Sequence, residues 1–132
     1  MNSRKEFSKI GSFVQQDDVL PALMTPRELF VFAARLRTNL EGENLNNHVD
    51  KILKRLKLLN CQNTIIGGVR IKGLSGGERK RTSIGYEMVA EPELLVLDEP
   101  TSGLDSVTSL TVLELMKREA IESHKAVIMT IH

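Results

Sequence analysis

The stretch ELLVLDEP, residues 93–100, decides the fold class of this 132-residue chain. It is a continuous apolar run of strand length that is closed by two acids and a proline. Such a run is typical of a strand buried on both faces of a parallel sheet, because a solvated face would carry alternating polar residues. We therefore predict a parallel α/β fold around this strand.

Strands and helices alternate on either side of this stretch. IGSFVQ, residues 10–15, mixes β-branched and aromatic residues and predicts a short strand that ends at Gln15 or Gln16. KAVIMTIH, residues 125–132, predicts another buried strand. Apolar periodicity and capping residues predict helices at TPRELFVFAARLR (25–37), NLNNHVDKILKRLKLL (44–59), SGGERKRTSIGYEMVA (75–90) and from about Asp105 to Glu119.

The composition is that of an ordinary globular protein, with 41% hydrophobic and 27% charged residues. The net charge of +1 gives no reason to expect nucleic acid as a partner, and we interpret the basic clusters at 51–57 and 79–81 as solvated helix faces. The single cysteine, Cys61, is typical of a reducing compartment. No apolar run approaches the roughly 20 residues of a membrane helix, so we expect membrane association to come through a partner.

Polar side chains follow each of the three predicted strands. Gln15 and Gln16 follow the first, Asp98 and Glu99 the second, and His132 stands at the end of the third. Ligands of open parallel sheets bind beyond the carboxyl ends of the strands, so these residues predict a site there. One acid can hold Mg²⁺ while the other accepts a proton from an attacking water. The alternative is that the two acids only mark the end of a strand or cap the next helix.

A second candidate site is GLSGGERKR, residues 73–81. Ser75 and Glu78 have the spacing of a capping box, which accounts for both residues without a ligand. Capping does not account for Gly76 and Gly77, because each glycine in a helix costs about 1 kcal/mol relative to alanine. Two interpretations stay open, plain helix capping and contact of a phosphate with the helix N-terminus.

A nucleotide site would also need a G-x-x-x-x-G-K-[ST] loop to cradle the phosphates, and residues 1–132 contain none. The nearest match runs from Gly68 to Ser75, but Leu74 stands in the lysine position. We reject this match, because without the lysine no charge reaches the outer phosphates.

Taken in order, FVQQDD, GLSGGERKR, LLVLDEP, TSGLD and the final IH resemble the downstream half of an ATP-binding cassette, the motor domain of ABC transporters. The motifs look most like the G subfamily, the white and pleiotropic-drug-resistance type. The resemblance covers essentially the whole chain. It implies part of a RecA-like P-loop NTPase core, residues 1–18 and 86–132, with an inserted helical subdomain, residues 19–85, and without the Walker A strand, loop and helix.

The resemblance also implies a role for each matching residue at the strand ends. Gln16 is similar to the Q-loop glutamine, which contacts Mg²⁺ and the attacking water. Asp98 matches the Walker B aspartate that holds Mg²⁺, and Glu99 matches the general base. His132 matches the switch histidine near the γ-phosphate of ATP.

The remaining matches concern contacts between two cassettes. The signature positions are Ser75, Gly76, Gly77 and Glu78. The D-loop positions, which would lie across a dimer interface, are Ser102, Gly103, Leu104 and Asp105. In this family Ser75 and Gly77 would touch the γ-phosphate of ATP. The implied partners are a second cassette, as homo- or heterodimer, and a transmembrane domain, and the implied location is the cytoplasmic face of a membrane.

The sequence departs from the family pattern at its start. The adenine-stacking aromatic and the phosphate loop of the family lie upstream of the Q-loop, where this chain has only MNSRKEFSKIGSFV. We expect the chain to be a fragment of a longer transporter, with weak ATP binding and negligible hydrolysis by itself. The alternative is a genuine short chain that borrows a phosphate loop from a partner.

The leading functional interpretation is ATP binding and hydrolysis that power transport of lipids or other hydrophobic compounds; the substrate class rests on the subfamily resemblance alone. A second interpretation is a non-catalytic interaction subunit that donates its signature and D-loop to the ATP site of a partner. A third is a DNA-maintenance ATPase of the SMC kind. The short insertion in this chain argues against the third, because those proteins insert long coiled coils.

Overall fold

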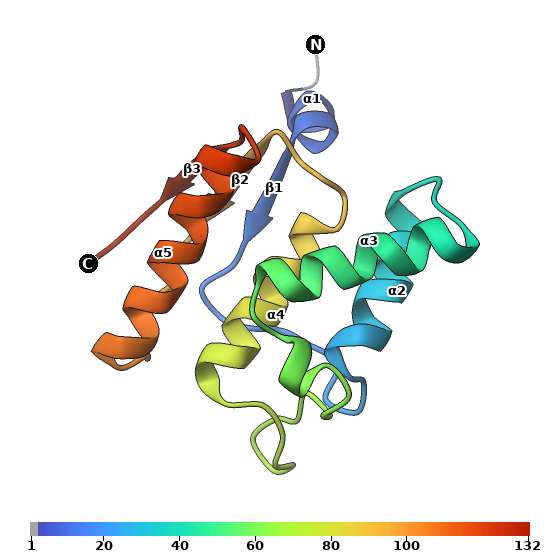
Figure 1. Ribbon diagram of the computed structural model, residues 1–132. Helices are drawn as coiled ribbons and strands as arrows, with labels where there is room; N and C mark the ends of the chain where they lie inside the picture. Colours follow the sequence, from blue (N-terminus) through green and yellow to red (C-terminus); the bar gives the residue numbers. More distant parts are fainter. Residues whose placement is uncertain (1–2) are drawn as a thin grey trace.

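The computed structural model describes residues 3–132 and contains a parallel sheet of three strands in the order β1-β2-β3. Figure 1 shows the strands side by side. Within the sheet, Val14 pairs with Leu97, and Leu97 pairs with Met129. The parallel α/β fold that residues 93–100 predict is therefore confirmed, and all three strands end at one edge of the sheet. The strands are β1 (Gly11–Val14), β2 (Leu94–Leu97) and β3 (Ala126–Met129).

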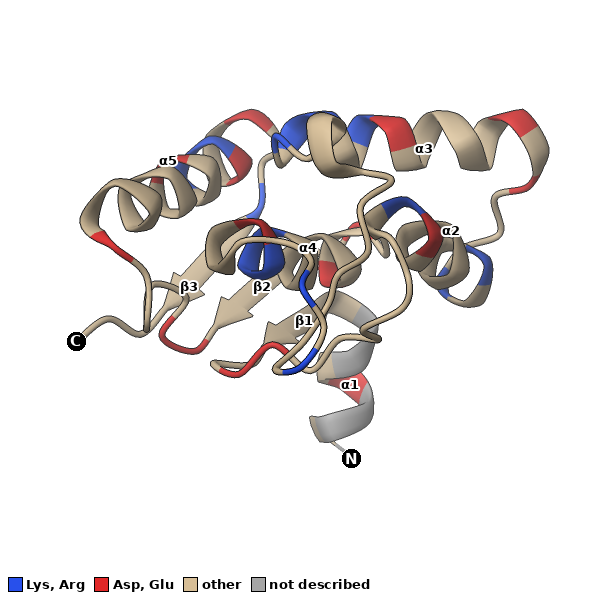
Figure 2. Cartoon of the chain, turned by 90° about the horizontal axis from the view of Figure 1, so that it is seen from below, with Lys and Arg blue, Asp and Glu red and all other residues tan. Residues whose placement is uncertain are grey.

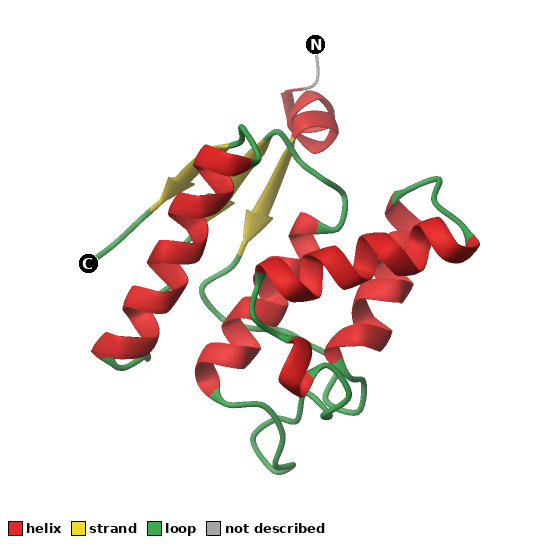
Figure 3. Cartoon of the chain, in the orientation of Figure 1, coloured by secondary structure: helices red, strands yellow, loops and turns green. Residues whose placement is uncertain are grey.

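The four predicted helices are present, and one more precedes the first strand. They are α1 (Ser3–Ile10), α2 (Pro26–Arg37), α3 (Gly42–Arg55), the short 3₁₀ helix η1 (Leu59–Cys61), α4 (Gly76–Met88) and α5 (Ser106–Glu122). The helix before the first strand is α1, and the one-turn η1 is a further element that the sequence does not predict. The longer helices that follow β1 form two groups in Figure 3, with α5 against the sheet and α2, α3 and α4 together, of which α4 contacts β1. None of the helices within residues 3–132 is long and apolar enough to cross a membrane.

Local capping sets the start of α2 as the sequence predicts. The Glu28 N–H donates to Oγ1 of Thr25 at 3.2 Å, and the Thr25 N–H donates to a carboxylate oxygen of Glu28 at 3.0 Å. Pro26 occupies the first helical position, where its missing N–H has no intrahelical partner to lose. The capping box therefore satisfies two backbone amides that the helix itself leaves unpaired.

Helices cover one face of the sheet. α4 packs on β1 and α5 packs on β3, over the face that carries the buried Val14 and Leu97. Figure 2 shows α3, α4 and α5 on the same side of the sheet. The opposite face carries Phe13, Val96 and Ile128 in one row, and Phe13 and Ile128 are 46% and 57% exposed. The prediction of a buried strand at residues 125–132 is therefore wrong for β3, and β2 is fully buried on only one face, with Leu94 and Val96 partly exposed, because these helices pack on the other side.

The core continues from the sheet into the helices, and its tightest point is at Gly85. A Cβ atom on Gly85 would lie 2.2 Å from Cζ of Phe30 and 2.7 Å from Cδ1 of Leu56. Phe30 and Leu56 are fully buried. Glycine at this position lets α4 approach α2 and the end of α3 more closely than any larger residue would allow.

The basic cluster at 79–81 is not the solvated face that its charge predicts. Lys80 is fully buried in α4, and Arg81 is half-buried. Arg81 donates to the carbonyl oxygens of Leu56 and Lys57 at 3.2 and 3.0 Å, where α3 ends. These hydrogen bonds satisfy carbonyl groups that a helix leaves unpaired at its C-terminus. Lys80 and Arg81 therefore belong to the packed interior of the fold, where Arg81 connects α4 to the end of α3.

Candidate functional site

The residues that follow the three strands lie together. The Asp98 N–H donates to the carbonyl oxygen of Val14 at 2.9 Å, and the Thr130 N–H donates to that of Leu97 at 3.1 Å. These bonds continue the sheet ladder one residue beyond β2 and β3. Figure 2 shows acidic segments in the loops at this edge of the sheet. The predicted convergence of polar residues at the carboxyl ends of the strands is therefore confirmed.

Glu99 and His132 form the closest pair at this edge. The His132 Nε2 atom lies 2.6 Å from Oε1 of Glu99, and the histidine side chain is largely exposed while that of Glu99 is mostly buried. Glu99 has a φ of 44°, in the left-handed region that a residue with a side chain rarely adopts. Backbone strain of this kind persists only where the surroundings fix it, and it is common at functional sites.

A threonine that the sequence analysis does not single out connects the two acids. The Glu99 N–H donates to Oγ1 of Thr130 at 2.9 Å, and the same hydroxyl donates to Oδ1 of Asp98 at 2.9 Å. Thr130 thus fixes the peptide of Glu99 and the carboxylate of Asp98 at once. The register of the two strands could have identified Thr130 as a site residue. Met129 pairs with Leu97, and the next residues on the two strands are Thr130 and Asp98.

Gln16 reaches the loop that follows Asp98 and Glu99. Its Nε2 atom donates to Oγ of Ser102 at 3.2 Å, which leaves the amide oxygen as the atom that can serve a metal ion. Gln16 and Gln15 are both exposed. The hydrogen bond joins two of the predicted site segments that lie far apart in the sequence.

The end of the predicted D-loop also has a structural role within the chain. Asp105 is the N-cap of α5, and its side chain accepts the Thr108 N–H at 2.7 Å. This backbone hydrogen bond holds the pKa of Asp105 below its ordinary value. Gly103 has a φ of 75°, so the loop turns at a residue that adopts this conformation without strain. Ser102, Gly103 and Asp105 are exposed.

The signature segment forms the predicted capping box at the start of α4. The Glu78 N–H donates to Oγ of Ser75 at 3.2 Å, and the Ser75 N–H donates to Oε1 of Glu78 at 3.0 Å. The hydrogen bond from the Ser75 backbone is the largest cause that holds the pKa of Glu78 below its ordinary value. Capping therefore accounts for both polar residues of the segment.

The two glycines of this segment differ in their surroundings. Gly77 is buried, and a Cβ atom there would lie 2.3 Å from Cγ2 of Thr108 on α5. Gly76 is exposed, and a Cβ atom there would make an ordinary contact with Leu104 at 3.4 Å. Packing against α5 thus explains Gly77, while Gly76 has no steric requirement for glycine within the described chain.

The predicted site residues fall into two groups. Gln16, Asp98, Glu99, Ser102 and His132 are linked at the strand ends by hydrogen bonds and by the close contact of His132 with Glu99, directly or through Thr130 and the peptide chain. The signature residues lie against the D-loop and α5 instead. Within residues 3–132, no hydrogen bond or ion pair joins the signature segment to the strand-end group.

The strand-end group fits the needs of Mg²⁺. This ion prefers oxygen ligands and usually takes one or two carboxylates, with water and substrate phosphates completing its shell. Asp98 supplies a carboxylate and Gln16 an amide oxygen at neighbouring strand ends. The described residues include no group of three His, Cys, Asp or Glu side chains that could hold a metal ion by themselves. The donor set therefore fits an ion that is bound together with a phosphate ligand.

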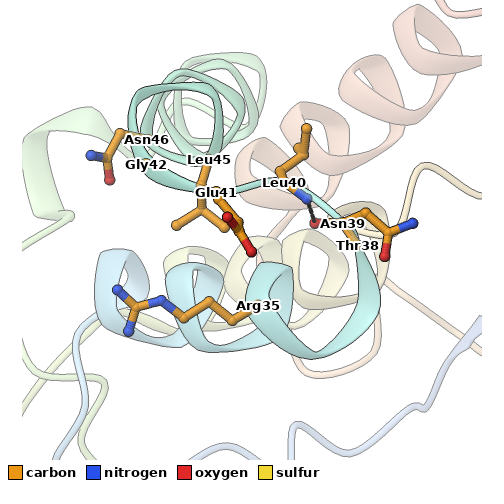
Figure 4. A pocket seen from close by; sticks show the side chains of 8 residues that line it. All are labelled: Arg35, Thr38, Asn39, Leu40, Glu41, Gly42, Leu45 and Asn46. Atoms are coloured by element: carbon orange, nitrogen blue, oxygen red, sulfur yellow. Dashed lines mark hydrogen bonds between the residues drawn. The ribbon is translucent and has the colours of Figure 1, made fainter.

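A pocket of about 580 Å³ lies elsewhere, between the end of α2 and the start of α3. Figure 4 shows Arg35, Glu41 and Asn46 around it. None of the predicted site residues lines this pocket, so it does not belong to either group.

Comparison with known proteins agrees with this geometry. The dimeric post-hydrolysis structure of the ATP-binding cassette MJ0796, bound to ADP and Pi, matches with a TM-score of 0.75 and 27% identity over 97% of this chain and 56% of that one. The fold is therefore that of an ATP-binding cassette, within the class of P-loop nucleoside triphosphatases. The family model for ABC transporters matches residues 1–102. The chain belongs to the ABC transporter family.

The curated relatives point to one subfamily. The chain is 50% identical over 127 residues to ABC transporter G family member 22 of Arabidopsis thaliana, which covers 95% of this chain and 17% of that protein. It is 44% identical over 131 residues to Protein white of Drosophila melanogaster, which covers 97% of this chain and 19% of that protein. The chain thus spans about a fifth of the length of these relatives. The resemblance to the G subfamily is confirmed.

Proposed function

We propose that this chain binds and hydrolyses ATP to power transport, as part of a transporter of lipids or other hydrophobic compounds. The observation that carries the proposal is the meeting of Asp98, Glu99 and His132 at one edge of the sheet, with Gln16 one hydrogen bond from the adjoining loop. The family and the G-type relatives support ATP-driven transport. The substrate class rests on the G-type relationship.

The roles at the strand ends follow from the chemistry of each side chain. We assign Glu99 as the base that accepts a proton from the attacking water, because its carboxylate is held by His132 and its peptide by Thr130. Asp98 and the amide oxygen of Gln16 would hold Mg²⁺, which when bound offsets the negative charge of the phosphates. His132 orients Glu99, and its exposed ring is open to a phosphate of the nucleotide.

The signature and the D-loop complete the proposal at a second cassette. Gly76 is exposed beside an N-capped helix start, which is a favourable place for a phosphate. We propose that Ser75, Gly76, Gly77 and Glu78 meet ATP held by another cassette. We propose that Ser102 to Asp105 lie at the contact between the two. Residues 1–18 and 86–132 would then form the core and residues 19–85 the helical subdomain.

A transmembrane domain is the other proposed partner, with the chain at the cytoplasmic face of a membrane. The G-type relatives support it. The phosphate loop of the site must come from outside residues 1–132, which contain no G-x-x-x-x-G-K-[ST]. We propose that the chain by itself therefore binds ATP weakly and turns it over negligibly.

The test uses what we call the grafted transporter. This is the Arabidopsis thaliana ABC transporter G family member 22 in which residues 1–132 of this chain replace the segment to which they are 50% identical. We expect ATP turnover by the purified graft, and a loss of at least about 100-fold with Glu99→Gln while ATP binding is kept. Glu93→Gln, at the other end of β2, is the matched control and should leave turnover unchanged.

Two results would contradict the proposal. Unchanged turnover with Glu99→Gln would remove Glu99 as the base. A graft that folds and binds ATP through its own phosphate loop, but has no turnover, would favour the second candidate, a non-catalytic subunit that donates its signature and D-loop to a partner.

A further inference from the structure

Lys80 is a buried charge that none of the assigned roles uses. It lies in α4, and only 2% of its surface is exposed. Its ammonium group donates to the carbonyl oxygens of Gln15 at 3.3 Å and Gln16 at 2.7 Å. The same group forms an ion pair with Oδ1 of Asp18 at 2.8 Å. All three partners belong to one short loop, residues 15–18, which follows β1.

Such an arrangement needs a reason, because burying an ammonium group costs several kcal/mol unless its donors are satisfied. The ammonium group donates two hydrogen bonds, both to backbone carbonyls, and the carboxylate of Asp18 offsets its charge. Because both hydrogen-bond acceptors are backbone carbonyls, the contact fixes the path of the main chain. Lys80 therefore holds the peptide of Gln16 at a defined place.

The other end of this connection is the signature segment. Lys80 is five residues after the N-cap Ser75, which is about 7.5 Å along a helix. Because the segment between them is regular helix, a movement of Ser75 and Gly76 carries Lys80 with it. The loop of Gln16 is then held by the same rigid element that begins with the signature.

We propose that Lys80 is a positioning residue that couples the signature helix to Gln16. The proposal rests on the function proposed above, in which the amide oxygen of Gln16 holds the metal ion. Lys80 touches neither nucleotide nor metal; it acts by fixing the main chain that carries the Gln16 side chain. Its loss should therefore lower kcat through misplacement of Gln16, with little change in the KM for ATP.

The first arm of the test uses the 132-residue chain itself and needs no activity. Backbone ¹⁵N relaxation gives the order parameter of the Gln16 amide, which we expect to be near that of rigid backbone, about 0.85. Lys80→Met keeps the apolar stem and removes the charge, and we expect the order parameter to fall below roughly 0.6. Asp17→Asn, in the same loop but exposed, is the control and should change nothing.

If Lys80→Met destabilises the chain, a second variant can be used in its place. Lys80→Met combined with Asp18→Asn leaves no buried carboxylate without its partner, and it should loosen Gln16 to the same extent. An order parameter of Gln16 that stays near the wild-type value in both folded variants would overturn the proposal.

The second arm uses the grafted transporter. We expect Lys80→Met to lower kcat on the order of tenfold to a hundredfold at an unchanged KM, and Lys80→Arg to recover part of kcat because it keeps the charge. A rise in KM at constant kcat, or a full kcat in Lys80→Met, would overturn the coupling. Absence of turnover in the wild-type graft would count against the proposed function instead, and the relaxation result decides the anchoring of Gln16 independently.

Discussion

The Nε2 atom of His132 lies 2.6 Å from Oε1 of Glu99, so the residues that follow β3 hold a residue that follows β2. Glu99 also has a left-handed backbone, with a φ of 44°, whose N–H donates to Oγ1 of Thr130. The β3 side of the site therefore fixes both the side chain and the peptide of Glu99. This relationship makes the orientation of the proposed base depend on residues 130–132.

The first prediction separates these two contacts. In the grafted transporter, His132→Ala should lower kcat on the order of a hundredfold, because the carboxylate of Glu99 loses its partner. Thr130→Val removes the hydroxyl from both Asp98 and Glu99 and should lower kcat as well. Ser109→Ala is the control, because the Ser109 hydroxyl makes only a weak hydrogen bond, at 3.5 Å, to the Leu104 carbonyl oxygen. Its turnover should stay near that of the wild type. Equal kcat for wild type and His132→Ala would contradict the orienting role of the histidine.

The second prediction compares two glycines of α4 under the same substitution. Gly85→Ala places a Cβ atom 2.2 Å from the ring of Phe30 and should lower the free energy of unfolding by about 1–3 kcal/mol, since the packed core must shift. Gly76→Ala meets only an ordinary contact at 3.4 Å and should raise that free energy by up to about 1 kcal/mol. Urea unfolding of the 132-residue chain measures both.

Gly76→Ala also tests the signature. Because we expect Gly76→Ala to stabilise the chain, a loss of turnover in the grafted transporter would not come from unfolding. We expect turnover to fall at least tenfold, because the added methyl group stands where the phosphate of the second cassette would approach the helix N-terminus. Turnover at the wild-type level would show that Gly76 serves the start of the helix alone.

Local signals made much of this structure predictable. The apolar run of β2 and the capping boxes at Thr25 and Ser75 depend on neighbouring residues, so one stretch of sequence contains the whole signal. The meeting of Gln16, Asp98 and His132 follows from a general property of parallel sheets, in which all strands end at one edge.

Features that depend on tertiary placement could not be predicted in the same way. Lys80 stands between two arginines, and its charge predicts a solvated position. Its spacing carried the opposite signal, because Lys80 is three residues after the buried Gly77 and four before the buried Ile84, on one stripe of the helix. The sheet face that carries Phe13, Val96 and Ile128 is another such feature. The sequence of β2 does not indicate on which side of the sheet α4 and α5 pack.

The third prediction concerns Cys61, which is buried at the end of η1. Burial raises the pKa of its thiol from 9.0 to about 11. At pH 8 the thiolate is then about a hundredfold scarcer than in the unfolded chain, so alkylation by iodoacetamide should be slower in the native chain by at least that factor. The reference is the same chain in urea, and similar rates in the two states would contradict the burial of the thiol.

The same shift gives a pH dependence of stability. The pKa of Cys61 is higher in the folded chain than in the unfolded chain, so the neutral thiol is the form that folding favours. Its contribution is fully present below pH 9 and is lost as the pH rises through about 11. Urea unfolding at pH values from about 8.5 to about 11 should show this fall in the free energy of unfolding of the wild type. The fall should be smaller in Cys61→Ala.

The fourth prediction contrasts a buried and an exposed acid on α5. Glu119 is 6% exposed and pairs with Arg55 of α3 and, at 3.5 Å, with the buried Lys125. Glu119→Ala leaves both cations without this carboxylate and should lower the free energy of unfolding by roughly 3 kcal/mol. Glu122→Ala removes only the exposed pair with Arg118 at 3.8 Å and should cost about 0.5 kcal/mol or less. If urea unfolding gave equal losses for the two variants, the network that joins α3 to α5 would contribute no more to stability than a surface pair.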